Sequence, residues 1–173
     1  MKTNFLIFLG LYLGSLIFRT CYELLKKSGK INPKSRIVFA VIFVVMCLMW
    51  ISWFKMGPLD SWHLTLPGIV RWVGLSLVIV GMGLAVGALV QLRGLENIDH
   101  LVTTGLFSKL RHPMYTGFIL WILGWAIFHD AIISLIVGFI GMGNIFYWLR
   151  LEDENLEKCY GESYLEYRQR TWF

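Results

Sequence analysis

Polar residues that could carry chemistry are concentrated in one short stretch of this sequence, residues 100–115. The stretch contains two histidines, a lysine, an arginine and a proline, and long apolar runs lie on both sides of it. Pro113 fixes its own φ angle and moves His112 away from helical geometry, which suits the first turn of a helix. A helix amino terminus carries unpaired N–H groups and a partial positive charge. We therefore expect Arg111, His112 and Pro113 to favour a carboxylate or another anionic group.

A second polar group follows the last apolar run, in the sequence Arg150-Leu-Glu-Asp-Glu154. Arg150 and Glu154 are four residues apart and share one face of a helix. The arginine could hold a carboxylate or a phosphate, and the acids could hold a cation or hydroxyl groups. Residue types alone leave another reading open for both groups, in which they are charged helix ends in water or at lipid head groups.

The composition indicates which elements must position these residues. Hydrophobic residues make up 57% of the 173 residues and charged residues only 16%, and the mean hydropathy is +0.63. This is less charge than a soluble domain carries, so we expect a single integral membrane domain over residues 1–173. The net charge of +5 is attributed to basic cytoplasmic loops and not to nucleic acid. Three widely spaced cysteines predict neither a disulfide nor a metal site.

Five apolar segments are expected to cross the membrane. A span needs about 20 apolar residues, and a helix satisfies every backbone polar group within one segment. The sequence therefore predicts an all-α fold with five transmembrane helices, over residues 5–24, 37–54, 69–91, 114–128 and 131–149. The last two form a helical hairpin, preceded by a cytosolic loop over 93–113 and followed by a cytosolic amphipathic helix over 150–173. The fourth segment is short, which places its start at or slightly below the membrane surface.

The basic residues also predict an orientation. They crowd into the loop after the first span, the 93–113 loop and the tail, so the amino terminus is expected outside and the carboxyl terminus in the cytosol. Because the first basic cluster follows the first apolar run, this run is interpreted as a retained span and not as a signal peptide. The run Gly81-Met-Gly-Leu-Ala-Val-Gly87 is interpreted as a helix-packing face, since a dinucleotide fingerprint would follow a strand. Gly57-Pro58 is expected in a loop, and Asn144 is expected to bond a neighbouring helix.

Longer motifs in the second half carry a resemblance to a known family. They are His100-Leu-Val-Thr-Thr-Gly-Leu-Phe-Ser-Lys-Leu-Arg-His-Pro-Met-Tyr-Thr-Gly117, then a hairpin, Asp153-Glu154 and Cys159-Tyr-Gly-Glu-Ser-Tyr-Leu-Glu-Tyr167. Over residues 84–173 the chain resembles the isoprenylcysteine carboxyl methyltransferase and phospholipid methyltransferase superfamily. Phe107 stands where tyrosine is common in that superfamily, Asp153 stands where glutamate is usual, and the spacing of Arg150 is shorter.

The resemblance implies a small membrane enzyme that takes S-adenosylmethionine from the cytosol and a lipophilic substrate from the bilayer, with S-adenosylhomocysteine as a product. It implies Arg150 and Glu154 as catalytic residues and no metal. The implied cofactor-binding residues are His100, Leu101, Val102, Gly105, Phe107, Arg111, His112, Pro113, Tyr115 and Glu154.

Two other functions remain open from the sequence. Membrane sterol or isoprenoid reductases that use NADPH resemble the same half of the chain, and a non-catalytic membrane scaffold would bind neither cofactor. For the methyltransferase, the acceptor could be a carboxylate, a thiol, a phospholipid amine or an isoprenoid. The expected partners are a lipophilic substrate and membrane lipids, with no nucleic acid, and the protein is expected to be a monomer or a homodimer.

Overall fold

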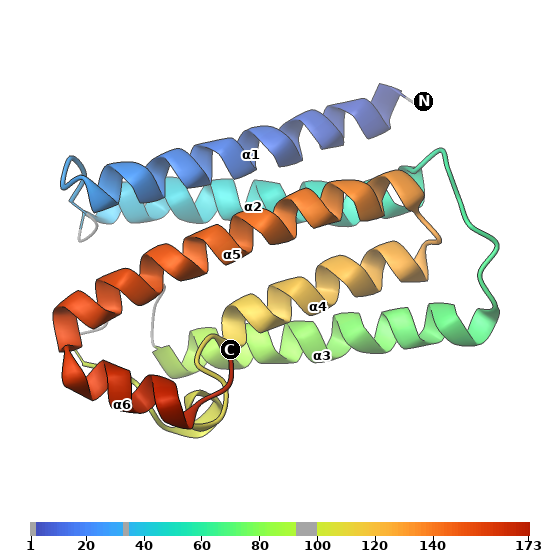
Figure 1. Cartoon of the computed structure of the whole chain (residues 1–173). Helices are drawn as coiled ribbons and strands as arrows, with labels where there is room; N and C mark the ends of the chain where they lie inside the picture. Colours follow the sequence, from blue (N-terminus) through green and yellow to red (C-terminus); the bar gives the residue numbers. More distant parts are fainter. Residues whose placement is uncertain (1–2, 33–34, 93–99) are drawn as a thin grey trace.

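The computed structural model describes residues 3–32, 35–92 and 100–173, and helices dominate these residues (Figure 1). The all-α prediction is therefore confirmed. In Figure 1 the first five α-helices run roughly side by side, and α6 lies at the end where α3 and α5 finish. The elements are α1 (Thr3–Lys27), α2 (Arg36–Leu59), α3 (Gly68–Leu92), the 3-10 turn η1 (Gly105–Ser108), α4 (Pro113–Phe128), α5 (Ile132–Tyr160) and α6 (Glu162–Arg170).

Four helices among the described residues, α1, α2, α3 and α5, are long and apolar enough to cross a membrane. The remaining apolar helix, α4, has 16 residues. At 1.5 Å per residue it is about 24 Å long, which is shorter than a hydrocarbon core of about 30 Å. Length and composition thus support four of the five predicted spans and an integral membrane protein, and α4 is a short apolar helix packed beside them.

The end of α2 differs from the prediction. Gly57 and Pro58 were expected in a loop, but the helix continues through them to Leu59. Proline lacks the N–H that would bond the carbonyl of Phe54. The indole N–H of Trp125, on α4, donates to this carbonyl instead, at 3.0 Å. A side chain from a neighbouring helix therefore satisfies the acceptor that the proline leaves open.

The carboxyl-terminal part of the chain also differs from the prediction. The expected separate helix over 150–173 is two pieces, because α5 continues unbroken to Tyr160 and α6 begins after Gly161. Gly161 has a φ of +51°, a conformation that favours glycine and ends α5. With 29 residues, α5 is about 43 Å long and must extend beyond a core of about 30 Å. The change from apolar to charged residues near Arg150 marks the edge of the apolar segment, not the end of the helix.

Glycines allow α3 and α4 to pack in close contact. A Cβ atom on Gly117 would lie 2.4 Å from the carbonyl oxygen of Gly81, and one on Gly124 would lie 2.5 Å from that of Gly74. Each helix carries its two glycines seven residues apart, so both pairs fall on one face. The interpretation of the glycine-rich run as a packing face is confirmed at Gly81. This face is covered within the chain by α4.

Polar residues join α1 to α5 inside the apolar bundle. The Thr20 hydroxyl lies 3.0 Å from Oδ1 of Asn144, and it accepts a hydrogen bond from Nε1 of Trp148 at 3.0 Å. The prediction that Asn144 bonds a neighbouring helix is therefore confirmed. These contacts hold one face of α1 against the half of α5 that leads to its charged end.

At the opposite end of the bundle, the buried Asp60 holds the start of α5. Its Oδ2 accepts hydrogen bonds from the backbone N–H of Ser134 at 2.7 Å and from the Ser134 hydroxyl at 2.8 Å. Its Oδ1 accepts one from the N–H of Trp62 at 3.0 Å. Ser134 lies in the first turn of α5, where N–H groups have no partner within the helix. The carboxylate therefore supplies the cap that α5 lacks in its own sequence.

Replacing Asp60 with alanine should lower the free energy of unfolding by about 1–3 kcal/mol, because buried donors would lose their acceptor. Thermal unfolding of the detergent-solubilised protein would measure the change. Ser61→Ala is a matched control from the same loop, since Ser61 is exposed, and it should change the free energy by less than about 0.5 kcal/mol. Equal stability of the two variants would contradict the capping role.

Candidate active site

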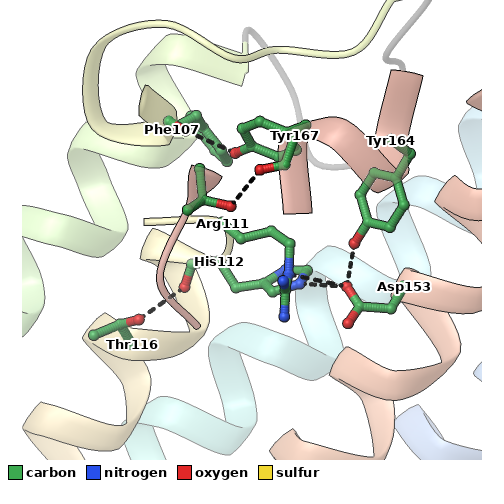
Figure 2. A network of polar contacts seen from close by, with 8 residues as sticks. Phe107, Arg111, His112, Thr116, Asp153, Tyr164 and Tyr167 are labelled. Carbon is green, nitrogen blue, oxygen red and sulfur yellow. Dashed lines mark hydrogen bonds and ion pairs between the residues drawn. The ribbon is translucent and has the colours of Figure 1, made fainter. Parts of the chain in front are cut away.

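A compact polar cluster forms where α4 begins (Figure 2). Pro113 is the first residue of α4, and His112 before it has φ −125° and ψ 62°, as the dipeptide predicts. Nε2 of His112 lies 2.6 Å from Oδ1 of Asp153 on α5, and the His112 side chain is only 3% exposed. Nε of Arg111 lies 3.5 Å from the same carboxylate oxygen. Asp153 therefore gathers two basic side chains that are adjacent in sequence and tethers the start of α4 to α5.

Tyr164 of α6 completes this cluster from the other side (Figure 2). Its hydroxyl donates a hydrogen bond to Oδ1 of Asp153. Burial, and then the hydrogen bond to the carboxylate, raise the pKa of the Tyr164 hydroxyl well above its usual range, so the hydroxyl keeps its proton. Sequence reasoning missed Tyr164 as a site residue, although it lies within the quoted Cys159–Tyr167 motif. Asp153 is thus the point at which α4, α5 and α6 meet.

The segment after α6 holds the polar stretch in place by backbone pairing. The N–H of Arg111 donates to the carbonyl of Trp172 at 2.8 Å, and the N–H of Trp172 donates to the carbonyl of Lys109 at 2.8 Å. In addition, the Tyr167 hydroxyl donates to the carbonyl of Phe107 at 2.7 Å. Burial raises the pKa of Tyr167 to about 12, so this donor is also protonated. The residues before α4 are therefore fixed from the carboxyl-terminal side.

A cavity of about 380 Å³ opens beside the cluster. This volume lies within the range of about 300–1,000 Å³ that is typical of small-molecule sites. Half of the predicted cofactor-binding residues line it: Phe107, His112, Pro113, Tyr115 and Glu154. The corner at Pro113 and the charged part of α5 thus share one hollow. Further lining residues come from α1 and α5: Arg19, Tyr22, Glu23, Lys26, Lys27, Trp148 and Glu152.

The other predicted site residues lie elsewhere among the described residues. The cavity lining does not include His100, Leu101, Val102, Gly105, Arg111 or Arg150. The Arg150 side chain is 79% exposed, and Arg111 forms an ion pair with Asp153. Residues 93–99 of the predicted cofactor loop, with Arg93, lie outside the described residues. The binding and catalytic roles of all these residues stay predictions.

Gly105 has a positioning task in this structure. Its φ is +58°, and a Cβ atom there would lie 2.5 Å from Nε2 of Gln91. The Gln91 side chain crosses the turn, since its amide donates to the carbonyl of Thr104 and its Oε1 accepts from the N–H of Leu106 at 3.1 Å. A glycine at this position lets the end of α3 hold the polar stretch through one glutamine.

Glu154 lies at the rim of the cavity and joins α5 to the end of α1. Nζ of Lys27 lies 2.7 Å from Oε2, and Nε of Arg150 lies 3.5 Å from Oε1. The Glu154 side chain is 39% exposed, so water reaches this ion pair and its contribution to stability is small. Glu154 therefore lines the cavity without contributing much to the stability of the fold.

The apolar helices define an integral membrane protein, and it has a cavity at one end of its helix bundle. The family described as phospholipid methyltransferase matches residues 69–163, which is more than half of the chain. The chain therefore belongs to the phospholipid methyltransferase family.

Similar proteins with assigned activities agree with the family. A protein-S-isoprenylcysteine O-methyltransferase of Dictyostelium discoideum is 29% identical over 94% of this chain and 75% of its own length. One of Arabidopsis thaliana is 29% identical over 61% of this chain and 61% of its own length. One of Schizosaccharomyces pombe is 32% identical over 44% of this chain and 33% of its own length. No solved structure matches the chain. The chain is thus an integral membrane methyltransferase.

Proposed function

We propose that this protein transfers a methyl group from S-adenosylmethionine to a lipophilic acceptor at the cytosolic face of a membrane. The proposal rests on one cavity that is lined both by the start of α4 (His112, Pro113 and Tyr115) and by Glu154 of α5. It lies at one end of an apolar bundle, where a water-soluble ligand and a lipid can meet. The similar proteins named above are O-methyltransferases of isoprenylcysteine.

The lining residues fit such a methyl donor. Carboxylates at Glu152 and Glu154 can accept hydrogen bonds from hydroxyl and ammonium groups. Aromatic rings at Phe107 and Tyr115 offer faces to an adenine base or to a sulfonium cation. When bound, S-adenosylmethionine supplies an electrophilic methyl group on a positively charged sulfur. These side chains would hold that donor, and Asp153 would keep the walls of the cavity in register.

Methyl transfer depends on the alignment of donor and acceptor more than on acid–base catalysis. The acceptor atom gives an electron pair to the methyl carbon while the carbon–sulfur bond breaks and its electrons pass to sulfur. The protein must therefore hold the two reactants in line and exclude water. A buried cluster that fixes α4, α5 and α6 to one another, as the Asp153 contacts do, serves this purpose.

The orientation of the chain is part of the proposal. Basic residues at the α1–α2 connection, in the polar stretch and in α6 belong to the end that holds the cavity, and Lys55 and Arg71 belong to the other end. By the positive-inside rule, this distribution favours the cytosolic side of the membrane for the end that holds the cavity. Lys2, Lys34 and Arg93, which also count toward this rule, lie outside the described residues. A carboxyl-terminal reporter that is active only outside the cell would refute this orientation.

Glu154→Ala should lower methyl transfer by about 100-fold, because displacement of a reactant by about 1 Å can cost that much. The variant should remain folded, since the ion pair with Lys27 is partly exposed. Transfer of a labelled methyl group in membranes measures activity, and thermal unfolding in detergent measures folding. Glu157→Ala, one turn along the exposed side of α5, is the matched control and should keep full activity. Normal turnover by Glu154→Ala would remove this residue from the site.

Two measurements separate the candidate functions. Calorimetry should show binding of S-adenosylmethionine and no binding of NADPH, whereas a reductase would show the opposite and a scaffold would bind neither. Membranes incubated with labelled methyl donor can then be fractionated to find the lipid that gains label. Release of the label as methanol by mild alkali would identify a carboxylate acceptor, because methyl ethers, thioethers and methylamines resist that treatment.

A further inference from the structure

A charged pair lies within the first helix and has no place in the function described so far. Arg19 and Glu23 of α1 form an ion pair, and their side chains are 11% and 12% exposed. Arg19 precedes Lys27, the last residue of α1, by eight residues, which places it about 12 Å from the helix end. Both side chains line the cavity. Ionisable residues within a membrane span are costly and usually mark a functional path.

The surroundings of this pair form one end of the cavity. The guanidinium carbon of Arg19 lies 5.1 Å from the ring centroid of Tyr22 and 5.5 Å from that of Trp148. Tyr115 on the α4 side and Glu152 on α5 line the same cavity. Polar groups from α1, α4 and α5 therefore converge there, away from the rim at Glu154.

The stability of the fold does not by itself explain the buried ion pair between Arg19 and Glu23. Removing two charges from water is costly, and exchanging a buried ion pair for apolar side chains is often neutral or favourable. The contacts between α1 and α5 already include the Thr20, Asn144 and Trp148 hydrogen bonds. In addition, α1 precedes the 69–163 region that matches the family model.

We propose that Arg19, oriented by Glu23, is the positioning residue that binds the anionic end of the methyl acceptor, an apolar chain that ends in a carboxylate. The inference rests on the proposed function. A guanidinium has five N–H donors in a planar fork, so it can hold Glu23 and an acceptor carboxylate together. The apolar chain of the acceptor would extend from Arg19 along α2, where Phe39, Ile42 and Met46 line the same cavity. A carboxylate oxygen has no proton to lose, so Arg19 need only hold it toward the donor.

The test measures binding of a simple probe pair, dodecanoate and dodecanol, to the full chain in phosphatidylcholine nanodiscs by equilibrium dialysis. At a pH that ionises dodecanoate, the wild type should bind it about tenfold more tightly than dodecanol, the size of one charge-assisted hydrogen bond. Arg19→Gln should remove this preference, and Arg19→Lys should keep part of it. Arg36→Gln is the matched control, because Arg36 is exposed at the start of α2, and it should leave the preference unchanged.

Glu23→Gln gives the result that a purely structural pair would not. Removing the competing carboxylate should tighten dodecanoate binding by about threefold to tenfold, while Arg19→Gln weakens it. A structural pair predicts the same loss for both variants, and that outcome would overturn the proposal. If Arg19→Gln does not fold, Glu23→Gln and Arg19→Lys still decide the question.

Binding of S-adenosylmethionine, measured by calorimetry on the same samples, separates this inference from the proposed function. Arg19→Gln should bind the donor as the wild type does. A wild type that binds dodecanoate through Arg19 but not the donor would refute the proposed function alone. Donor binding with dodecanoate affinity unchanged in Arg19→Gln would refute the Arg19 site alone.

Discussion

Asp153→Ala is expected to abolish methyl transfer and to lower the free energy of unfolding by about 3–5 kcal/mol, the cost of removing one member of a largely buried ion pair. The carboxylate is the shared acceptor for His112, Arg111 and Tyr164. With its removal the start of α4 loses its tether to α5, and Tyr164 of α6 loses its hydrogen bond to α5. The walls of the cavity would then lose their relative placement, which in-line transfer cannot tolerate.

Thermal unfolding and labelled methyl transfer, measured on the same membrane preparation, would check this expectation. Asp153→Asn should fall between the wild type and Asp153→Ala, because the amide keeps an acceptor oxygen without the charge. Glu157→Ala, an exposed acid on the same helix, should match the wild type in both measurements. An active and stable Asp153→Ala protein would show that α4, α5 and α6 hold the cavity by other contacts.

Gly117→Ala should lower the free energy of unfolding by about 1–3 kcal/mol through overpacking. The new Cβ atom would lie 2.4 Å from the carbonyl oxygen of Gly81 and 2.9 Å from the backbone N of Ala85. Both contacts are with backbone of α3, so the helices must move apart. The substitution should also lower methyl transfer, because Phe118, the next residue on α4, lines the cavity.

Gly83→Ala is the matched control for this effect and should change stability in the opposite direction. A Cβ atom on Gly83 meets nothing within 4 Å, so the substitution should stabilise α3 by up to about 1 kcal/mol through helix propensity. Unfolding of both variants in the same detergent gives the comparison. If Gly117→Ala also gained stability, α3 and α4 would not be in the close contact described here.

Three consecutive acids on α5 illustrate how one helix serves several neighbours. Glu152 lines the cavity together with Tyr115, Asp153 bonds His112, and Glu154 bonds Lys27. Successive residues point about 100° apart around a helix, at 3.6 residues per turn. The short run Glu-Asp-Glu therefore faces the cavity, the start of α4 and the end of α1. This division requires α5 to remain helical beyond its apolar segment, as it does up to Tyr160.

The positions of most helices and the start of α4 could be predicted from the local sequence. Long apolar runs determine helices because no other single segment satisfies its backbone in lipid. The observed helices contain the first four predicted apolar segments completely, and the fifth from its second residue onward. Pro113 determined where α4 begins, since its ring excludes helical geometry at His112. The glycine-rich run Gly81–Gly87 predicted close helix packing, which is observed at Gly81. Each of these inferences depends on neighbours in the chain.

The partners of the charged residues were decided only by the tertiary structure. A helix that faces lipid is apolar on most sides, so hydrophobic periodicity does not reveal which side faces the interior. The rotation of each helix is set by packing, here by the glycine contacts of α3 with α4 and by the Thr20 contacts of α1 with α5. That rotation turned Arg150 toward solvent and brought Arg19, from a distant part of the chain, into the cavity.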